Sequence, residues 1–544
     1  MPTAKESLLD LLAGAGVDTV FGNPGTTEFP LMDALGGQDR LGYRLALHDA
    51  VAVGMAHGHT LATGCPAMVN LHAGPGVTNA MGNIYNAAKS GVPLFITAGQ
   101  IDTRLQLYEP PLWADLATLM RPVSKWAHEV RNADELVPAA RRALKVALTP
   151  PKGPVFLALP YDILDHPTGG AQPPFVVPSP AAEPDAQAVD YAAQLIARAE
   201  RPVVIVGDGL ANSASSDAVL RLAEEAGCKI LGERIPPTAP VPTDHPLYHG
   251  TIGASSGAIG AALGQADVLI LAGARRLVPV VDDGGWELPP GVHVVQVDDD
   301  PWELGKILHY DVGILSDPAE AFRALADAVA KTGDDRREAV ATRREALERE
   351  GHELWAQRDV ETAGDGLSAA RVVRALREHA SADTVVFDES LTSTRALLRH
   401  YPLKPEHFYG IKGTSLGWGL PAAVGHQIGD PSRPVVAFMG DGATLYSLQA
   451  LWSAAHYDAP LTTIVVNNRS YKILKEGLDS YRGGTPGHYL GMDIKQPTID
   501  YQALAQGFGV AARQTSNSDE LDDAIRWAMD AGPAVLEVLV DDDA

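Results

Sequence analysis

Cysteine is rare in this chain, which has only Cys65 and Cys228 among its 544 residues. These two residues lie far apart in the sequence. A disulfide-stapled scaffold or a cysteine-based zinc site needs several cysteines at close spacing. The sequence therefore predicts neither kind of structure.

Positive charge is also in short supply. The chain has 43 lysines and arginines against 68 aspartates and glutamates, which gives a formal net charge of −25. Nucleic acids and anionic membrane surfaces repel such a chain, so we expect no nucleic-acid partner. A bound phosphate group would have to rely on a metal ion, glycine amides and helix ends more than on lysines.

Long hydrophobic runs are missing as well. No apolar stretch is long enough to span a bilayer, although hydrophobic residues make up 46% of the chain. The first residues, MPTAKESLLDLLAGAGV, fit an amphipathic helix and not a signal peptide. We therefore expect a cytoplasmic protein without a membrane partner, and the length predicts about three domains.

The most informative part of the chain is the block at residues 435–468, VVAFMGDGATLYSLQALWSAAHYDAPLTTIVVNN. An apolar strand runs into the turn GDG, a helix-length segment follows, and a second apolar strand ends in NN. In a parallel unit the carboxyl ends of both strands lie at one edge of the sheet, where open α/β sheets bind ligands. Oxygen atoms of Asp441 and Asn468, beside a glycine loop and a helix amino terminus, suit a magnesium ion that carries a diphosphate.

A second GDG, at residues 207–209, provides an internal control. It also follows an apolar strand, but the next strand, KILGER, ends in no asparagine pair. Glycine and aspartate at a strand end commonly make a turn, so we interpret this copy as structural. It also lacks the close glycine spacing of a dinucleotide fingerprint, which argues against a nicotinamide dehydrogenase.

A segment similar to this block lies near the amino terminus. The segment that begins at Val69, VNLHAGPGVTNAMGNIYNAAKSGVPLFITAG, follows the same plan without gaps. Gly74 falls opposite Asp441, and His72 stands two positions earlier. An internal repeat predicts two similar α/β domains, each holding half of one ligand. The alternative is that all strand–helix–strand units look alike.

Strands alternate with helices along the whole chain, which predicts parallel sheets with helices on both faces. A proline-rich stretch at 167–184 and a charged stretch at 333–366 divide the chain into three segments. The predicted strands are 19–21, 67–71, 93–98 and 154–159 in the first segment, 203–207, 229–231, 268–272 and 293–297 in the second, and 384–387, 435–438, 463–466 and 534–540 in the third.

Together these motifs resemble the thiamine diphosphate-dependent decarboxylases and carboligases over nearly the whole chain. GNPGTTEFP (22–30), NLHAGPG (70–76) and SLGWGLPAAVG (415–425) are most similar to benzoylformate decarboxylase, and acetohydroxyacid synthase is the next most similar group. The resemblance implies an α/β fold of three doubly wound parallel-sheet domains. These are a pyrimidine-binding domain (1–166), a middle Rossmann-like domain (185–332) and a diphosphate-binding domain (366–544).

The resemblance also implies cofactors and a reaction. Thiamine diphosphate and Mg²⁺ would serve the non-oxidative decarboxylation of a 2-oxo acid, through a thiazolium carbanion and an enamine. The implied metal ligands are Asp441, Asn468 and the backbone carbonyl of Ser470. The other implied cofactor-binding residues are Asp49, Thr392, Ser393, Thr414, Leu416, Gly440, Gly442, Ala443, Thr444, Asn468 and Tyr471. Among these, Leu416 fits the bulky residue that bends the cofactor into its V shape.

The implied substrate pocket draws on both ends of the chain. His72 matches the active-site histidine of benzoylformate decarboxylase, and an imidazole side chain is suited to donating a proton near neutral pH. Thr26 stands where that enzyme has a substrate-facing serine, so a hydroxyl is retained. Ile473 and Leu474 would form an apolar wall, which suits an oxo acid with a hydrophobic substituent. For Thr26, a plain helix cap is the alternative.

Two positions depart from the family pattern. Asp49 aligns with the glutamate that activates the cofactor, and its carboxylate is one methylene shorter. A misplacement on the order of 1 Å can cost about a hundredfold in rate, unless closer packing or a water compensates. Val280 aligns with a second histidine, which the middle domain of benzoylformate decarboxylase supplies. Arg275, Arg276 or Asp282 could supply polarity in its place, although arginines that follow a strand usually lie at the surface.

The sequence is therefore compatible with three functions. Catalytic residues Asp49, His72 and Thr26 would serve a benzoylformate decarboxylase-like enzyme. A carboligase or lyase of the acetolactate synthase type, with a second aldehyde or ketone acceptor, uses the same cofactor. A weakly active cofactor-binding relative is the third. The resemblance implies that Asp49 and Asp441 of one site come from different subunits, so we expect a homodimer or a dimer-of-dimers homotetramer.

Overall fold

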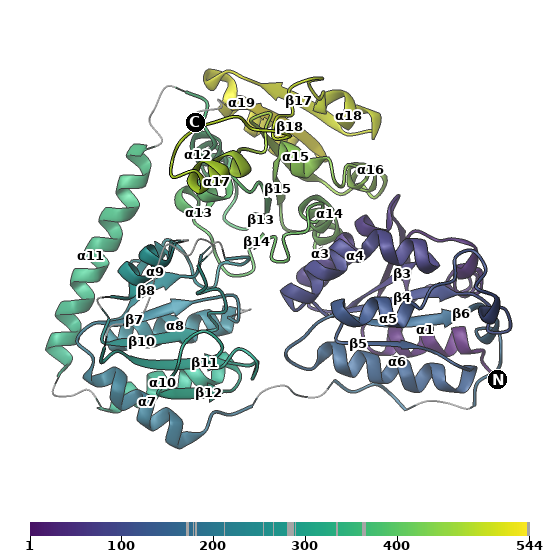
Figure 1. The fold of residues 1–544 in the computed structure, drawn as a ribbon, viewed down its shortest axis with the longest axis horizontal. Coiled ribbons are helices and arrows are strands. Elements are labelled where there is room, and N and C mark those ends of the chain that lie inside the picture. Colours follow the sequence, from purple (N-terminus) through teal and green to yellow (C-terminus); the bar gives the residue numbers. More distant parts are fainter. Residues whose placement is uncertain are drawn as a thin grey trace. The chain divides into compact units, whose positions relative to one another are not determined.

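The computed structural model describes residues 1–169, 173–177, 179, 182–210, 213–234, 236–253, 255–264, 266–279, 288, 290–332, 336–361 and 366–540. Val280 lies outside the described residues. The chain forms two compact units (Figure 1). The first contains Met1–Ser179, Gly366–Ser393 and Ile411–Ala544, and the second contains Pro180–Asp365 and Thr394–Gly410.

The amino-terminal part of the first unit is a parallel six-stranded sheet in the order β2-β1-β3-β4-β6-β5. Its strands are β1 (Thr19–Gly22), β2 (Gly42–Leu45), β3 (Ala67–Leu71), β4 (Leu94–Gln100), β5 (Trp126–Glu129) and β6 (Val155–Pro160). Its helices are α1 (Ala4–Gly14), α2 (Phe29–Gly36), α3 (Asp49–Thr63), α4 (Ala73–Ser90), α5 (Leu116–Met120) and α6 (Ala133–Leu148). The central strands β3 and β4 are buried along their whole length, as expected of a sheet covered on both faces.

The carboxy-terminal part of the first unit repeats this plan. Its strands in this unit are β13 (Val385–Glu389), β15 (Val435–Gly440), β16 (Leu461–Asn467), β17 (Ala511–Thr515) and β18 (Ala534–Leu539). Its helices are α12 (Ala369–His379), α14 (Gly419–Gly429), α15 (Asp441–Thr444), α16 (Gln449–His456), α17 (Lys472–Tyr481), α18 (Tyr501–Gly507) and α19 (Leu521–Asp530). The order β13-β15-β16-β18-β17 matches β1-β3-β4-β6-β5, which confirms the predicted internal repeat.

Helices α3 and α14 join the two halves of the first unit, and their backbones approach closely. A Cβ atom at Gly58 would overlap the carbonyl of Ala422, and one at Gly425 would overlap the carbonyl of Met55. Only glycine allows helices to cross at such a short distance without a shift of the backbone. The indole nitrogen of Trp418 also donates to Nδ1 of His57 at 3.1 Å.

The second unit is built on a parallel sheet in the order β12-β11-β10-β7-β8-β9. Its strands are β7 (Pro202–Val206), β8 (Lys229–Gly232), β9 (Tyr248–Thr251), β10 (Val268–Ala272), β11 (His293–Asp298) and β12 (Val312–Leu315), and β14 (Phe408–Gly410) also belongs to this unit. Its helices are α7 (Ala186–Arg198), α8 (Ser213–Ala226), α9 (Ser256–Leu263), α10 (Pro318–Thr332), α11 (Arg337–Glu361) and α13 (Thr394–His400). Separate hydrophobic clusters cover the two faces of the sheet.

The predicted fold class, three doubly wound parallel sheets, is confirmed. Residues 337–361 of the charged stretch form the long helix α11 (Figure 1). Among the described residues, no helix combines the length and the apolar character that a membrane crossing requires.

Candidate active site

The carboxyl ends of β15 and β16 open into one pocket, as the GDG-to-NN block predicts. Asp441 begins α15 directly after β15, and Asn468 follows the last residue of β16. Both side chains are more than nine-tenths buried. The pocket is lined by Ser390, Leu391, Thr392, Ser393, Leu416, Gly440, Asp441, Gly442, Ala443, Val466, Asn468, Ser470, Tyr471, Lys472 and Ile473.

The carboxylate of Asp441 is only partly satisfied by the protein. Its Oδ1 accepts the amide of Gly442 at 2.8 Å, whereas the buried Oδ2 has no hydrogen-bond partner among the described residues. Burial raises the pKa of Asp441 to about 6, against the opposing effect of nearby backbone amides. A buried carboxylate oxygen without a partner is costly, and a bound cation would remove that cost.

The donor set around Asp441 suits Mg²⁺ and a diphosphate. The described residues contain no group of three or more His, Cys, Asp or Glu side chains that could hold a metal. The predicted ligands are instead one carboxylate, the amide oxygen of Asn468 and the carbonyl of Ser470, all hard oxygens of the kind that Mg²⁺ prefers. Asn468 Oδ1 is fixed by the amide and hydroxyl of Ser470 at 3.0 and 3.3 Å.

Strained backbone surrounds this pocket. Leu391, Thr414 and Arg469 have left-handed φ values of 55°, 61° and 56°, which are uncommon for residues other than glycine. A Cβ atom at Gly442 would lie 2.5 Å from Cε1 of Tyr471, so glycine is required for the loop to pack there. Such strain concentrates at functional sites, where the surrounding structure holds it in place.

The turn that carries Leu416 is anchored by a residue that the sequence analysis did not identify as functional. Glu389, at the end of β13, is fully buried and accepts the amides of Gly417, Trp418 and Gly419 at 2.6, 3.0 and 2.5 Å. Burial raises the pKa of Glu389 to about 7, although these three hydrogen bonds favour the carboxylate. Glu389 therefore fixes the backbone directly after Leu416.

Asp49 lies at the first position of α3. The residue is 3% exposed, and its Oδ2 accepts Nδ2 of Asn79 at 3.3 Å. Its Oδ1 has no hydrogen-bond partner in the described part of the chain. A Cβ atom at Gly76 would lie 2.6 Å from this oxygen and 3.3 Å from Cβ of His72. Asp49 and His72 therefore pack against the same first turn of α4.

His72 is oriented by a second residue that the sequence analysis missed. Its Nδ1 lies 2.8 Å from Oε2 of Glu28, whose side chain is fully buried. Glu28 also accepts the hydroxyl of Thr27 and the amides of Gly25 and Gly99 at 2.7, 2.9 and 3.0 Å. A carboxylate bound at Nδ1 fixes the orientation of the imidazole ring and leaves Nε2 as the nitrogen that can contact a ligand.

Not every predicted residue reaches the pocket. Thr26 is exposed, and its neighbour Thr27 makes the hydroxyl contact with His72, at 3.3 Å. Thr444 donates its hydroxyl to the carbonyl of Gly440, while Thr414 and Leu474 are exposed and do not line the pocket. Of the two predicted wall residues, only Ile473 lines the pocket around Asp441.

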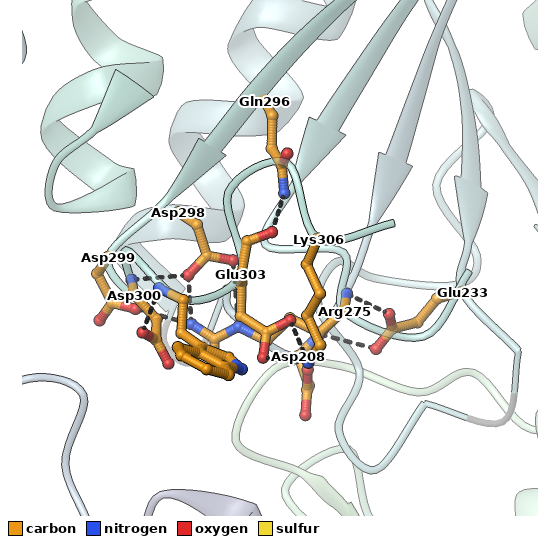
Figure 2. A network of polar contacts seen from close by, with 10 residues as sticks. Asp208, Glu233, Arg275, Gln296, Asp298, Asp299, Asp300, Glu303 and Lys306 are labelled. Carbon is orange, nitrogen blue, oxygen red and sulfur yellow. Dashed lines mark hydrogen bonds and ion pairs between the residues drawn. The ribbon is translucent and has the colours of Figure 1, made fainter. Parts of the chain in front are cut away.

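The GDG turn of the second unit is bound into its own sheet, in accordance with the structural interpretation. The amides of Gly207 and Gly209 donate to the carbonyls of Ala272 and Gly273. Beside it, Figure 2 shows Glu233 accepting the amides of Asp208 and Arg275, at 3.2 and 2.9 Å.

Arg275 belongs to the same polar network. Its guanidinium pairs with Asp298 and Asp299 at 2.5 and 2.8 Å (Figure 2). Its charge is therefore bound within the second unit. The position of Val280, five residues further on, lies outside the described residues.

Comparison with known proteins finds similarity to one enzyme family in all three segments of the chain. Residues 2–119, 189–325 and 392–538 match the N-terminal TPP binding domain, the central domain and the C-terminal TPP binding domain of thiamine pyrophosphate enzymes. Benzoylformate decarboxylase of Pseudomonas aeruginosa is 32% identical over 99% of both chains. Acetolactate synthase large subunit of Lactococcus lactis is 25% identical over 99% of this chain and 93% of that protein. The structure of the thiamine diphosphate-dependent 4-hydroxybenzoylformate decarboxylase of Rhodococcus jostii RHA1 matches with a TM-score of 0.86 and 28% identity, over 99% of both chains.

Proposed function

Because this chain belongs to the thiamine pyrophosphate enzymes, which include decarboxylases and carboligases, we propose that it decarboxylates a 2-oxo acid without oxidation. Thiamine diphosphate, anchored through Mg²⁺, is the proposed cofactor. The observation that carries the proposal is the buried Oδ2 of Asp441, which has no hydrogen-bond partner within the described part of the chain and lies in a pocket shared with Asn468.

Residues of the carboxy-terminal half would hold the cofactor. Asp441, Asn468 and the carbonyl of Ser470 are the proposed metal ligands. The diphosphate would be bound by the backbone amides of the loop after β15 and by the hydroxyls of Thr392 and Ser393. Hydrogen-bond donors at a loop and helix amino terminus can bind an anion without the charge of a lysine. Leu416 would shape the bound cofactor.

Residues of the amino-terminal half would move protons. Thiamine diphosphate, when bound, supplies the carbon nucleophile and the electron sink that this reaction needs. Asp49 would hold a proton shared with the pyrimidine ring, and its Oδ1, to which no described residue donates a hydrogen bond, is available for that bond. His72 would deliver a proton from Nε2, because Glu28 binds Nδ1 at 2.8 Å. Ile473 offers an apolar wall to the substituent of the substrate.

Carboligation is the second candidate. Carboligation is favoured by Val280, which stands where the resemblance to benzoylformate decarboxylase implies a second histidine and which cannot donate a proton. Slower protonation would leave time for a second aldehyde or ketone to react. The 25% identity to acetolactate synthase over most of the chain is compatible with this outcome.

A second copy of the chain is the proposed partner. Every described residue that lines the Asp441 pocket lies between 390 and 473, so Asp49 does not contribute to it within this chain. A homodimer, or a homotetramer made of two dimers, would supply the missing carboxylate from a neighbouring subunit. Light scattering after size-exclusion chromatography would measure the assembly, and a monomer that is fully active would contradict it.

The decisive experiment measures carbon dioxide and products together. The purified protein is incubated with thiamine diphosphate, Mg²⁺ and either benzoylformate or an aliphatic 2-oxo acid, with and without an acceptor aldehyde. We expect carbon dioxide release that requires the cofactor and is greater with the aromatic acid. Release of free aldehyde would support decarboxylation, and a 2-hydroxy ketone would support carboligation. Neither product from any oxo acid would refute both candidates.

A further inference from the structure

Helix α4 carries three asparagines on one face. Asn79, Asn83 and Asn86 stand at positions i, i+4 and i+7, a spacing that aligns side chains along a helix. Asn83 and Asn86 are 2% and 1% exposed. Buried amides of this kind are costly unless they are fully hydrogen-bonded, so their partners reveal what they are for.

Asn83 and Asn86 bind the backbone on both sides of Leu416. Nδ2 of Asn83 donates to the carbonyl of Gly417 at 3.0 Å. Nδ2 of Asn86 donates to the carbonyl of Ser415 at 2.7 Å, and its Oδ1 accepts the amide of Ser415 at 3.2 Å. The two side chains thus hold the residues directly before and after Leu416.

The same asparagines reach the start of the helix that carries Asp49. Nδ2 of Asn83 also donates to the carbonyl of Ala50 at 2.7 Å, and Nδ2 of Asn79 donates to Asp49 Oδ2 at 3.3 Å. Nδ2 of Asn86 donates to Oδ1 of Asn83 at 3.0 Å, which links the two amides. Both hydrogens of Asn83 therefore point at carbonyls, and this fixes the orientation of its amide.

The contact leaves no room for adjustment. A Cβ atom at Gly82 would overlap the hydroxyl of Ser415, and one at Gly413 would overlap Oδ1 of Asn86. On its other side, the turn is bound by Glu389 through three backbone amides. The segment 415–419 is therefore held between a buried carboxylate and the asparagine ladder, by which we mean Asn79, Asn83 and Asn86.

We propose that the asparagine ladder sets the position of the Asp49 carboxylate relative to the Leu416 turn, and that Asn83 is its central positioning residue. This inference rests on the proposed function, in which Asp49 and Leu416 both act on thiamine diphosphate. The two elements belong to one chain, so the ladder fixes them to each other even when they serve cofactors in neighbouring sites. A short activating acid makes this precision more important, because it tolerates less displacement than a glutamate.

The test replaces Asn83 by an isosteric side chain that cannot donate. In Asn83→Asp the two donors to the Ala50 and Gly417 carbonyls are lost without a change in size. Asn132→Ala is the matched control, because it removes the N-cap of α6, whose side chain accepts the amide of Glu135, and leaves the ladder intact. Asn83→Ala and Asn86→Ala repeat the measurement if the aspartate variant does not fold.

Two readouts separate positioning from general stability. The first is amide hydrogen exchange of the full-length protein without cofactor, followed in peptides that cover 46–54 and 413–420. The second is the exchange rate of the thiazolium proton of bound thiamine diphosphate in deuterated buffer, measured at saturating cofactor and Mg²⁺, together with the cofactor Kd.

We expect faster amide exchange in both peptides of the Asn83 variant, and a thiazolium proton exchange that is slower by about tenfold or more. The cofactor Kd should change by less than about threefold, because other residues hold the diphosphate. Asn132→Ala should leave all three measurements unchanged. Thiazolium exchange within twofold of the wild type in the Asn83 variant, or an equal slowing in Asn132→Ala, would overturn the positioning role alone. A wild-type protein that does not bind the cofactor would overturn the proposed function and this inference with it.

Discussion

The two halves of the first unit share a strand order but present their carboxylates differently. Asp441 sits in a glycine loop, where the backbone amide of Gly442 holds one oxygen. Asp49 sits at a helix start, where the side chain of Asn79 holds one oxygen. Each residue keeps its other oxygen buried, with no hydrogen-bond partner among the residues that the structure describes. The comparison shows one strand order, used twice, in which a half-satisfied buried carboxylate is held by a backbone amide in one half and by an asparagine side chain in the other.

The largest effect should come from Asp441→Ala, which removes the proposed metal ligand of the carboxy-terminal half. We expect the affinity for thiamine diphosphate with Mg²⁺ to fall by about a hundredfold or more. Even residues that only hydrogen-bond to a metal ligand contribute about ten- to a hundredfold to metal affinity. Titration of cofactor fluorescence or circular dichroism measures this. Asp208→Ala, in the GDG turn of the second unit, is the matched control and should bind like the wild type. Equal losses in both variants would contradict the assignment.

The amino-terminal half is tested next by Glu28→Gln, which removes the carboxylate that orients His72. We expect kcat to fall by about tenfold or more with a smaller change in KM, because proton transfer contributes about 10²–10⁴-fold and the histidine itself remains. Steady-state kinetics give both constants. The pair His128–Glu135, also 2.8 Å apart, offers the control Glu135→Gln, which should keep the wild-type kcat. A wild-type kcat in Glu28→Gln would remove His72 from the mechanism.

A smaller effect is expected from Asp49→Glu, which restores the family acid. We expect exchange of the thiazolium proton to become faster by about two- to tenfold, because the longer side chain reaches further. Quenched exchange followed by NMR measures the rate. A large loss of exchange would instead mean that the tight packing at Gly76 is built around the shorter acid.

The last prediction concerns stability without cofactor, where no catalytic rate is measured. The pKa of Asp441 is raised to about 6 in the folded protein, so the folded state binds more protons than the unfolded state between about pH 4 and pH 6. Stability is therefore lost as the pH rises through that range. At pH 7.5 the free energy of unfolding of Asp441→Asn should exceed that of the wild type by about 1–2 kcal/mol, so the variant should unfold at a higher temperature. At pH 4 the two proteins should unfold at the same temperature. Scanning calorimetry at the two pH values checks this, and a destabilised variant at pH 7.5 would disprove it.

Much of the fold could be predicted because its central strands are buried and continuously apolar, as in VVAFM of β15. The strands that the sequence analysis missed are short or partly polar. β5 (WAHE), β9 (YHGT) and β17 (AARQT) are examples, and each shows intermediate or exposed positions. The sequences of such strands show no alternating or continuous hydrophobic pattern. They become strands because they pair with a neighbouring strand of the folded sheet.

The candidate site shows the same limit. Asp441 and Asn468 could be placed from the sequence because each follows a recognisable strand. Glu28 and Glu389 could not, because a single buried carboxylate is defined by amides that come from distant parts of the chain. The ladder of α4 did leave a signal, the spacing N-x-x-x-N-x-x-N at residues 79–86, which an ordinary polar helix face also produces.

The close crossing of α3 and α14 has a consequence for the thermal unfolding of the first unit. With glycine at 58 and 425 pressed against carbonyls of the opposite helix, neither half of the first unit can melt without exposing the other. Heating should therefore give one shared transition for both halves, and Gly58→Ala, which wedges the helices apart, should divide that transition into two.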